Sequence, residues 1–432
     1  MIRLATLILL FFFLNQCSFN ENSKLWKKKE KKLEIKKNIK QVFSENKIIN
    51  TEFNQELKLD LTKIRSGNKI IGNQNNYGSQ DYIGSLNKIG NYKFSKLDNI
   101  KEINYKPLFL DNGLIFFDNK GSIIRYNNKQ KVLWKKNHYS KYEKKLRPKL
   151  NFVFEKENLL VTDNKAKYYS VNINSGELNW SKESTYPFNS EIKKANNKIF
   201  VVDYKNTLRC YNIFDGSECW NLQTEDSFTI SDSQFSLIII GDMIVFSNSV
   251  GDITAADIET GLIKWQLPTQ SSSIKNKTYN FKISKLVSDN KSIFFSNNKN
   301  QFYSIDAKTG TINWINEINS NLTPIISDNF IFTVSNEGYL YVVEKNKGNI
   351  IRITDLYINY KIKKRKSIKP IGFVVGDTKL YLTNNDGKMI NVDLSSGNVV
   401  SIKKIAGNFI SRPFIFNQNL FIIKNGSIIQ YN

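Results

Sequence analysis

The chain has 432 residues, with 63 Lys and Arg against 39 Asp and Glu, so its formal net charge is +24. A single histidine, His138, argues against His-based triads, His-cluster metal sites and a haem attachment motif, and three cysteines without a CxxC pair argue against a zinc ribbon or a thioredoxin-like site. Aromatic residues make up 13% of the chain and favour a β-rich globular protein.

Residues 1–16 have the pattern of a secretory signal peptide. Arg3 gives a positive start, and the apolar stretch from Leu4 to Leu14 is too short to span a bilayer. The following Leu14-Asn15-Gln16-Cys17 resembles the lipobox of bacterial lipoproteins, although Gln16 stands where that pattern has a small residue. The resemblance implies acylation (palmitate) at Cys17 and, with Ser18 next, anchoring at the periplasmic face of the outer membrane. The alternative is a secreted protein whose Cys17 belongs to the leader.

Residues 17–50 are then expected to form a lipid-anchored basic tether. The segment from Glu21 to Asn50 contains ten Lys and four Glu with few turn residues, which fits a solvated linker or attraction to anionic headgroups. It holds the one clear lysine cluster, while Asn, Lys and Ile are frequent throughout the chain. We therefore expect no nucleic-acid partner. Residues 51–90 read as a linker, rich in Gly, Asn and Ser from Asn68 onward.

A repeat occupies the rest of the chain. From about Leu114, an apolar strand, a polar turn, a second strand, a turn with Gly and a third strand recur, and five of the six tryptophans end successive copies. These are Trp134, Trp180, Trp220, Trp265 and Trp314, at spacings of 46, 40, 45 and 49 residues. Such a period is typical of β-propeller blades, each of which is a small sheet that needs neighbours on both faces.

Eight blades follow from the copies. Two more units lack the Trp but keep a turn glycine, Gly348 or Gly397, and a last unit ends at Asn432. An additional strand upstream, often after Pro, makes four antiparallel strands per blade. We therefore predict an all-β, eight-bladed propeller over residues 91–432. The short last blade needs a partner strand, which we assign to Tyr92–Leu97 with Phe94 at the Trp position.

The repeat, clearest at Asp306-Ala307-Lys308-Thr309-Gly310-Thr311-Ile312-Asn313-Trp314, resembles the propeller repeat of the pyrroloquinoline-quinone (PQQ) type. Two bacterial families share it: quinoprotein dehydrogenases, which hold PQQ and Ca²⁺, and the outer-membrane assembly lipoproteins of the BamB family, which use the ring without a cofactor. The leader, the single ring and the length are similar to the BamB family over essentially the whole chain. The dehydrogenases are longer and have inserts that supply cofactor ligands.

The BamB resemblance implies a non-catalytic scaffold that has no cofactor. It would bind the periplasmic domains of BamA and other assembly lipoproteins, and help deliver and insert unfolded outer-membrane proteins. In that family an apolar-x-apolar-Arg loop after the third Trp unit contacts BamA, which corresponds here to Phe228, Thr229, Ile230 and Ser231. Ser231 replaces the Arg, and Tyr279-Asn280-Phe281-Lys282 lacks the family's acidic contact. Ordinary strand packing is the alternative role of Phe228 and Ile230.

Other functions stay open from the sequence. One is a divergent periplasmic PQQ-dependent dehydrogenase, and another is an envelope propeller that binds a different protein or a polysaccharide. Cys210 and Cys219 flank the turn at Phe214-Asp215-Gly216, so they could form a cross-strand disulfide or stay as two thiols.

Overall fold

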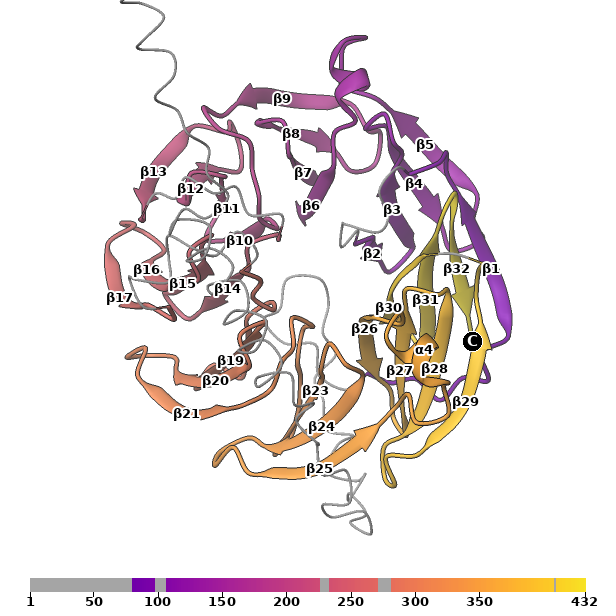
Figure 1. Cartoon of the computed structure of the whole chain (residues 1–432). Helices are drawn as coiled ribbons and strands as arrows, with labels where there is room; N and C mark the ends of the chain where they lie inside the picture. Colours follow the sequence, from indigo (N-terminus) through magenta and orange to yellow (C-terminus); the bar gives the residue numbers. More distant parts are fainter. Residues whose placement is uncertain (1–79, 98–105, 226–232, 271–280, 408) are drawn as a thin grey trace, which may run out of the picture. The chain divides into compact units, whose positions relative to one another are not determined.

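The computed structural model describes residues 80–97, 106–225, 233–270, 281–407 and 409–432. The chain divides into two units, residues 1–50 and 51–432, and every described residue lies in the second. The described residues of that unit form eight four-stranded antiparallel sheets arranged as blades around an axis (Figure 1). The predicted all-β, eight-bladed propeller is confirmed. Cys17 and the residues assigned to the signal peptide and tether lie outside the described residues.

The first four blades follow chain order from the inner to the outer strand. Blade 1 contains β2 (Leu108–Leu110), β3 (Gly113–Phe117), β4 (Ile123–Asn127) and β5 (Val132–Lys136). Blade 2 contains β6 (Leu150–Glu155), β7 (Asn158–Asp163), β8 (Lys167–Asn172) and β9 (Leu178–Glu183). Blade 3 contains β10 (Lys193–Ala195), β11 (Lys198–Val202), β12 (Thr207–Asn212) and β13 (Glu218–Gln223). Blade 4 contains β14 (Leu237–Ile240), β15 (Met243–Ser247), β16 (Ile253–Asp257) and β17 (Ile263–Leu267).

The next three blades repeat this order, and the last does not. Blade 5 contains β18 (Val287–Ser288), β19 (Ser292–Asn297), β20 (Gln301–Asp306) and β21 (Ile312–Asn316). Blade 6 contains β22 (Ile325–Ser327), β23 (Phe330–Val334), β24 (Tyr339–Glu344) and β25 (Ile350–Asp355). Blade 7 contains β26 (Pro370–Val375), β27 (Lys379–Asn384), β28 (Lys388–Asp393) and β29 (Val399–Lys404). Blade 8 contains β30 (Ile410–Phe416), β31 (Asn419–Lys424), β32 (Ser427–Tyr431) and β1 (Lys88–Lys93).

Burial changes from the middle to the outside of each blade. In β19, Ile293, Phe294 and Phe295 are all fully buried, because both faces of this strand are covered by neighbouring blades. The outer strand β21 has Ile312 and Ile315 nearly half exposed. The middle strands therefore hold most of the apolar core, and the outer strands form the rim of the ring.

The predicted tryptophans join neighbouring blades. Each lies on an outer strand and donates its indole N–H to a backbone carbonyl in the next blade, over 3.1 Å from Trp134 to Ile173 and 3.0 Å from Trp314 to Lys345. The other three make the same bond, from Trp180 to Ile213, Trp220 to Ile258 and Trp265 to Ala307. The Trp series is thus one structural position repeated five times.

The turn glycine of each following blade lies beneath the indole. Gly310 has φ +73°, and a Cβ there would lie 2.6 Å from the ring of Trp265. The same relation holds at the other four Trp interfaces, where the glycines are Gly176, Gly216, Gly261 and Gly348. Both the left-handed backbone and the closeness of the indole therefore exclude a side chain at this position.

The interface between blades 6 and 7 uses an arginine instead. Arg352 occupies the register position of the Trp and is 2% exposed. Its guanidinium donates to the carbonyls of Leu394 (3.1 Å) and Ser395 (2.7 Å), and its side chain covers Gly397. The Gly-only unit expected from the sequence is thus a blade in which Arg replaces Trp.

A strand from the N-terminal side of the ring closes it, as predicted, but this strand is Lys88–Lys93 rather than Tyr92–Leu97 and begins within the residues assigned to the linker. β1 pairs antiparallel with β32, with Asn91 opposite Ile429 and Tyr92 opposite Ile428. In the other blades a continuous turn joins the third and fourth strands, but here two separate chain segments take its place. Leu86 donates its N–H to the carbonyl of Asn432 (2.7 Å), and Asn432 donates its N–H to the carbonyl of Asn87 (3.1 Å). In blade 5 the equivalent bonds run from the N–H of Gly310 to the carbonyl of Asp306 and from the N–H of Asp306 to the carbonyl of Thr311. Leu86 has φ +62°, the conformation that a glycine holds in the continuous turns.

The placement of Phe94 at the Trp position was wrong. The β-bulge before Trp134 recurs in β1 between Lys88 and Gly90, so Gly90 is the residue in Trp register. The facing turn of blade 1 is correspondingly altered, because Gln130, with φ +58°, stands where blades 2 to 7 have glycine and its side chain lies against Gly90. At the interface between blades 8 and 1, the small residue therefore lies at the Trp position and the large residue at the turn-glycine position.

Candidate functional site

One face of the ring carries the longer connections. Since the four strands of a blade alternate in direction, each connection from an outer strand to the next inner strand leaves the ring on the same face as the turn between the second and third strands. The described connections there include the 3₁₀ helix η1 (Glu143–Leu146) and the short helix α4 (Ile362–Arg365). None of the described helices is long and apolar enough to cross a membrane.

The predicted partner-binding residues fall in one such connection. Phe228, Thr229, Ile230 and Ser231 lie between β13 and β14 and outside the described residues, so the structure does not place them. Of the stretch from Tyr279, only Phe281 and Lys282 are described. Phe281 is buried against Gly251, and Lys282 borders the cavity on the ring axis.

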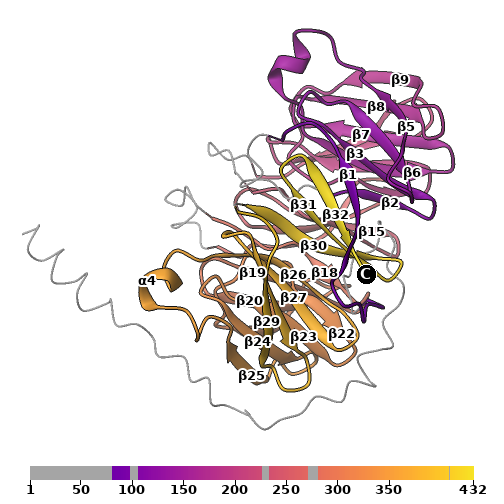
Figure 2. The ribbon, with the colours of Figure 1, turned by 90° about the vertical axis from the view of Figure 1, so that its right-hand side faces the viewer.

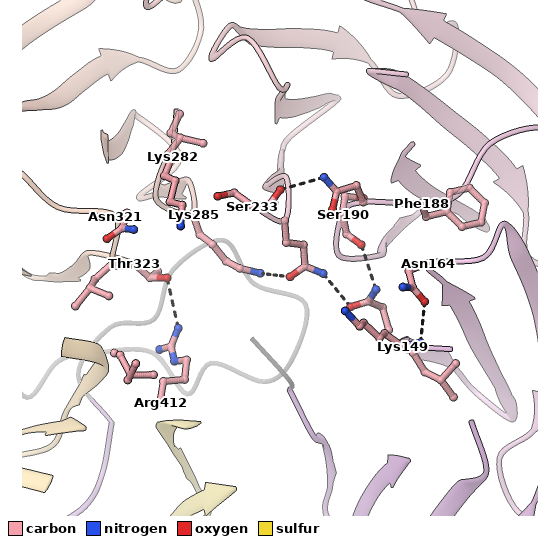
Figure 3. A pocket seen from close by; sticks show the side chains of 18 of the residues that line it. Lys149, Asn164, Phe188, Ser190, Ser233, Lys282, Lys285, Asn321, Thr323 and Arg412 are labelled. Atoms are coloured by element: carbon pink, nitrogen blue, oxygen red, sulfur yellow. Dashed lines mark hydrogen bonds between the residues drawn. The ribbon is translucent and has the colours of Figure 1, made fainter. Parts of the chain in front are cut away.

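This axial cavity has a volume of about 240 Å³ and is lined by residues from all eight blades. Figure 3 shows Lys149, Lys282, Lys285 and Arg412 around it. These four are basic, and none of the 21 described residues that line it is acidic. The sequence offered no signal for this cluster, because its members come from three blades and, apart from Lys282 and Lys285, are far apart in the chain.

Hydrogen bonds link the inner strands around the cavity. Lys285 donates to the amide oxygen of Gln234 (3.3 Å), and Gln234 donates to Asn151 (3.1 Å). Asn151 in turn donates to the carbonyl of Ser190 (3.2 Å). This chain of bonds joins blades 2 to 5 and fixes the position of Lys285 (Figure 3).

One carboxylate lies behind the lining. Glu191 is 3.4 Å from Lys285, and both side chains are largely buried, at 13% and 14% exposed. Burial alone would raise the pKa of Glu191, but attraction to Lys193, Lys285 and Lys106 overcomes it and holds the pKa at about 2. The pKa of Lys106 is lowered by burial, opposed by Glu191 and assisted by Arg412. Glu191 is therefore charged at neutral pH and surrounded by cations.

Arg412 is fixed beside the cavity. It is 9% exposed and donates to Thr323 Oγ1 (3.5 Å) and to the carbonyl of Phe373 (3.4 Å), and its guanidinium lies 5.7 Å from the ring centre of Phe414. Gly372 makes room for it, since a Cβ there would come within 2.6 Å of the Arg412 side chain.

A second basic feature occupies the connection between blades 6 and 7. There α4 projects from the ring (Figure 2), with Lys361, Lys363 and Lys366 exposed beside Ile362, which is 77% exposed. Arg365 holds the helix to Asp355 over 2.5 Å. The prediction that the only lysine cluster lies in the tether overlooked this one, which is visible in the sequence as Lys361-Ile362-Lys363-Lys364-Arg365-Lys366.

The outer strands form open edges with exposed aliphatic residues. Such residues occur on β5, β17, β21 and β29 and are 42–55% exposed: Val132, Leu133, Ile263, Ile312, Ile315, Val400 and Ile402. An open edge with apolar side chains can accept an added strand or an apolar partner surface.

The structure also bears on cysteine and metal chemistry. Cys210 is buried and Cys219 is exposed, and both are free thiols. Burial, then the neighbouring Cys219, raises the pKa of Cys210. Within the described ranges, no group of three or more His, Cys, Asp or Glu side chains is placed to hold a metal ion.

Comparisons with known proteins agree with this architecture. The family model described as outer membrane protein assembly factor BamB matches residues 119–354, more than half of the chain. Among solved structures, BamB from Moraxella catarrhalis is similar at a TM-score of 0.61 and 14% identity, covering 80% of this chain and 97% of that one. Quinohemoprotein alcohol dehydrogenase from Comamonas testosteroni is similar at a TM-score of 0.63 and 8% identity, covering 88% and 83%. No curated protein matches by sequence.

Proposed function

Because the chain belongs to the family of the outer membrane protein assembly factor BamB, we propose that it is a non-catalytic scaffold lipoprotein of the outer-membrane β-barrel assembly machinery. It binds the periplasmic domains of BamA and other lipoproteins of the complex, and helps deliver and insert unfolded outer-membrane proteins. Cys17 anchors it at the periplasmic face of the outer membrane. The match of the family model over residues 119–354 is the observation that carries this proposal.

The geometry supports a scaffold in two ways. The ring is cross-linked at each of five interfaces by an indole hydrogen bond, so its loops are presented on a rigid frame. The outer strands leave open edges, such as β21 with Ile312 and Ile315, which suit pairing with extended chains or with the edge of a partner's sheet.

Phe228 and Ile230 are the residues that we assign to the BamA contact, on the family pattern at residues 228–231. Replacing both by Glu should abolish binding of the purified periplasmic part of BamA, since buried apolar anchors dominate interfaces and unpaired buried charges are costly. Calorimetry or surface binding measures the affinity.

The matched control is the double variant Phe214→Glu, Leu262→Glu. Phe214 and Leu262 are 62% and 70% exposed, and they lie in the turns between the third and fourth strands of blades 3 and 4, on the opposite face of the ring. The control should bind BamA as the wild type does. Equal binding by all three proteins would refute the assignment of the contact, and failure of the wild type to bind would refute the proposed function.

A further inference from the structure

The connection between blades 6 and 7, residues 356–369, is strongly basic. It contains six basic residues and no acidic one: Lys361, Lys363, Lys364, Arg365, Lys366 and Lys369. Two of them are paired with carboxylates of the adjoining blades, Arg365 with Asp355 and Lys364 with Asp386. The others point their charge to solvent, with Lys361, Lys363, Lys366 and Lys369 all exposed.

The chain segments beside this basic connection leave it positive. They are residues 317–324, 335–338, 385–388 and 405–409, all described except the uncharged Asn408. They carry three carboxylates and one further cation: Glu317, Glu337, Asp386 and Lys388. The pKa of Lys388 is lowered, first by its contact with Lys364, although Asp386 lies close to it. Like charges are therefore crowded at this place.

The basic connection is anchored to the ring at both ends. Tyr357 is fully buried, donates its hydroxyl to the amide oxygen of Asn384 over 2.8 Å, and covers Gly338 so closely that no Cβ fits there. Ile368, 2% exposed, holds the other end. Between them Tyr360 packs edge-on against Tyr357, with ring centres 5.8 Å apart. The lysines are thus displayed at a fixed place, where α4 projects from the ring (Figure 2).

Two aliphatic side chains stand among these lysines. Ile358 and Ile362 are 66% and 77% exposed, and Ile362 is the first residue of α4. A single exposed isoleucine is ordinary on a protein surface. Together with several lysines it has the character of a membrane-surface segment, in which apolar side chains enter the acyl boundary while ammonium groups stay among the headgroups.

The residue types favour a lipid surface over a protein or a nucleic acid. Protein interfaces are enriched in Arg and aromatic residues and depleted in Lys, whereas the one arginine here is paired with Asp355 and the exposed cations are lysines. Single-stranded nucleic acids stack on exposed aromatic rings, but Tyr357 is buried and Tyr360 is half-buried. Lysine ammonium groups on flexible stems suit a fluid layer of phosphates.

We propose that the basic connection is a docking surface for an anionic lipid bilayer. Lys361, Lys363 and Lys366 contact the headgroup phosphates, and Ile362 enters the acyl boundary. This contact is additional to the acyl anchor proposed at Cys17, and it fixes which part of the ring faces the membrane. It needs only the ring and lipid, so it is tested independently of BamA binding.

The test is co-sedimentation of the full chain with vesicles, either of phosphatidylcholine alone or of equal parts phosphatidylcholine and phosphatidylglycerol. Every protein carries Cys17→Ser, so that no acyl chain holds it to lipid, and the leader and tether are the same in all of them. The triple variant is Lys361→Gln, Lys363→Gln, Lys366→Gln. Its control, Lys129→Gln, Lys308→Gln, Lys347→Gln, removes three exposed charges from turns on the opposite face. Thermal melts establish that each variant is folded.

A second readout is local to α4 and does not depend on the tether. An environment-sensitive dye is attached at Ile362→Cys, with Cys219→Ser added because Cys219 is the exposed thiol of the ring. The control carries the dye at Leu262→Cys, a 70%-exposed position in a turn on the opposite face.

We expect the parent chain and the charge control to bind anionic vesicles equally, and the triple variant to bind at least about tenfold more weakly. The dye at position 362 should shift to shorter wavelength on anionic vesicles, and the dye at 262 should not. Equal binding by the triple variant and its control, or the absence of a shift at 362, would overturn the proposal. Loss of BamA binding by the triple variant, with vesicle binding unchanged, would also overturn it and assign the surface to a protein partner.

Discussion

The interface between blades 6 and 7 gives the sharpest test of how the ring is held together. Arg352 replaces the tryptophan of the other units, and its guanidinium is almost fully buried, which lowers its pKa. It donates to two carbonyls, those of Leu394 and Ser395. We expect Arg352→Ala to destabilise the ring strongly, while Arg352→Trp keeps wild-type stability.

The magnitudes follow from the contacts. Hydrogen bonds to charged groups contribute about 1.5–3 kcal/mol each, so loss of both bonds should cost about 3–6 kcal/mol in Arg352→Ala. The cavity left by the side chain adds to this cost. In Arg352→Trp an indole N–H can donate to Leu394 as the other tryptophans donate, and Gly397 already provides the space. Removal of a buried charge is neutral or favourable when the replacement packs well, so the change should stay within about 1 kcal/mol.

Thermal unfolding followed by circular dichroism measures both variants. Arg352→Ala should lower Tm by about 5–10 °C, and Arg352→Trp should melt close to the wild type. If Arg352→Trp were as unstable as Arg352→Ala, the equivalence of the Arg and Trp interfaces would be refuted.

Three further predictions concern closure, turn geometry and pH. Tyr92→Ala should lower the free energy of unfolding by about 3–5 kcal/mol in urea titrations, because the side chain is 2% exposed and its ring contacts blades 1 and 8. The control Tyr142→Ala, at a 71%-exposed residue, should change it little, and equal losses would contradict ring closure by β1. Gly310→Ala should lower the free energy of unfolding more than Gly241→Ala does in the same assay, since both glycines have positive φ but only a Cβ at Gly310 would lie against Trp265. Equal losses would show that the indole contact is unimportant. The pKa of Glu191 is depressed to about 2, so the contribution of its charge to folding stability is present above its unfolded pKa and is lost as pH falls from about 5 to about 2. In acid titrations Glu191→Gln should lack this loss of stability, and an acid profile equal to that of the wild type would contradict the prediction.

The sequence predicted the blades because their markers recur within single units. Each Trp, such as Trp265, and each turn glycine, such as Gly310, lies at a nearly fixed number of residues from the strands of its own unit. Alignment of the copies was therefore enough to predict the blades. Arg352 was not recognised because the repeat was read by residue type, whereas the structural requirement is a long side chain that donates to a carbonyl and covers a glycine.

The closing blade shows a different limit. Alignment by similarity placed Phe94 on the Trp, but the register of a strand is fixed by its bulge, and the bulge lies between Lys88 and Gly90. Phe94 contacts Phe116 of blade 1 instead, with ring centres 4.9 Å apart. At the closing interface, Gly90 stands at the Trp position and Gln130 at the facing turn-glycine position, so the large and the small residue have changed places. A comparison of single units cannot detect this exchange, because the two residues belong to different blades.

The axial cavity could not be predicted from any single unit. Lys149, Lys285 and Arg412 come from different blades, and each looks like a solvated lysine or arginine in the sequence. Only closure of the ring brings them together around one space. The site is therefore a product of the topology, and its chemistry becomes visible only when all eight blades are placed.

Co-purification from detergent-solubilised outer membranes tests the central claim most directly. The full chain, expressed at native level with an affinity tag, should recover BamA in proportion to itself, and the double variant Phe228→Glu, Ile230→Glu should lose it while retaining wild-type abundance and melting temperature. Recovery of the wild type without BamA, with a different envelope protein in stoichiometric amount, would contradict the assignment to the β-barrel assembly machinery.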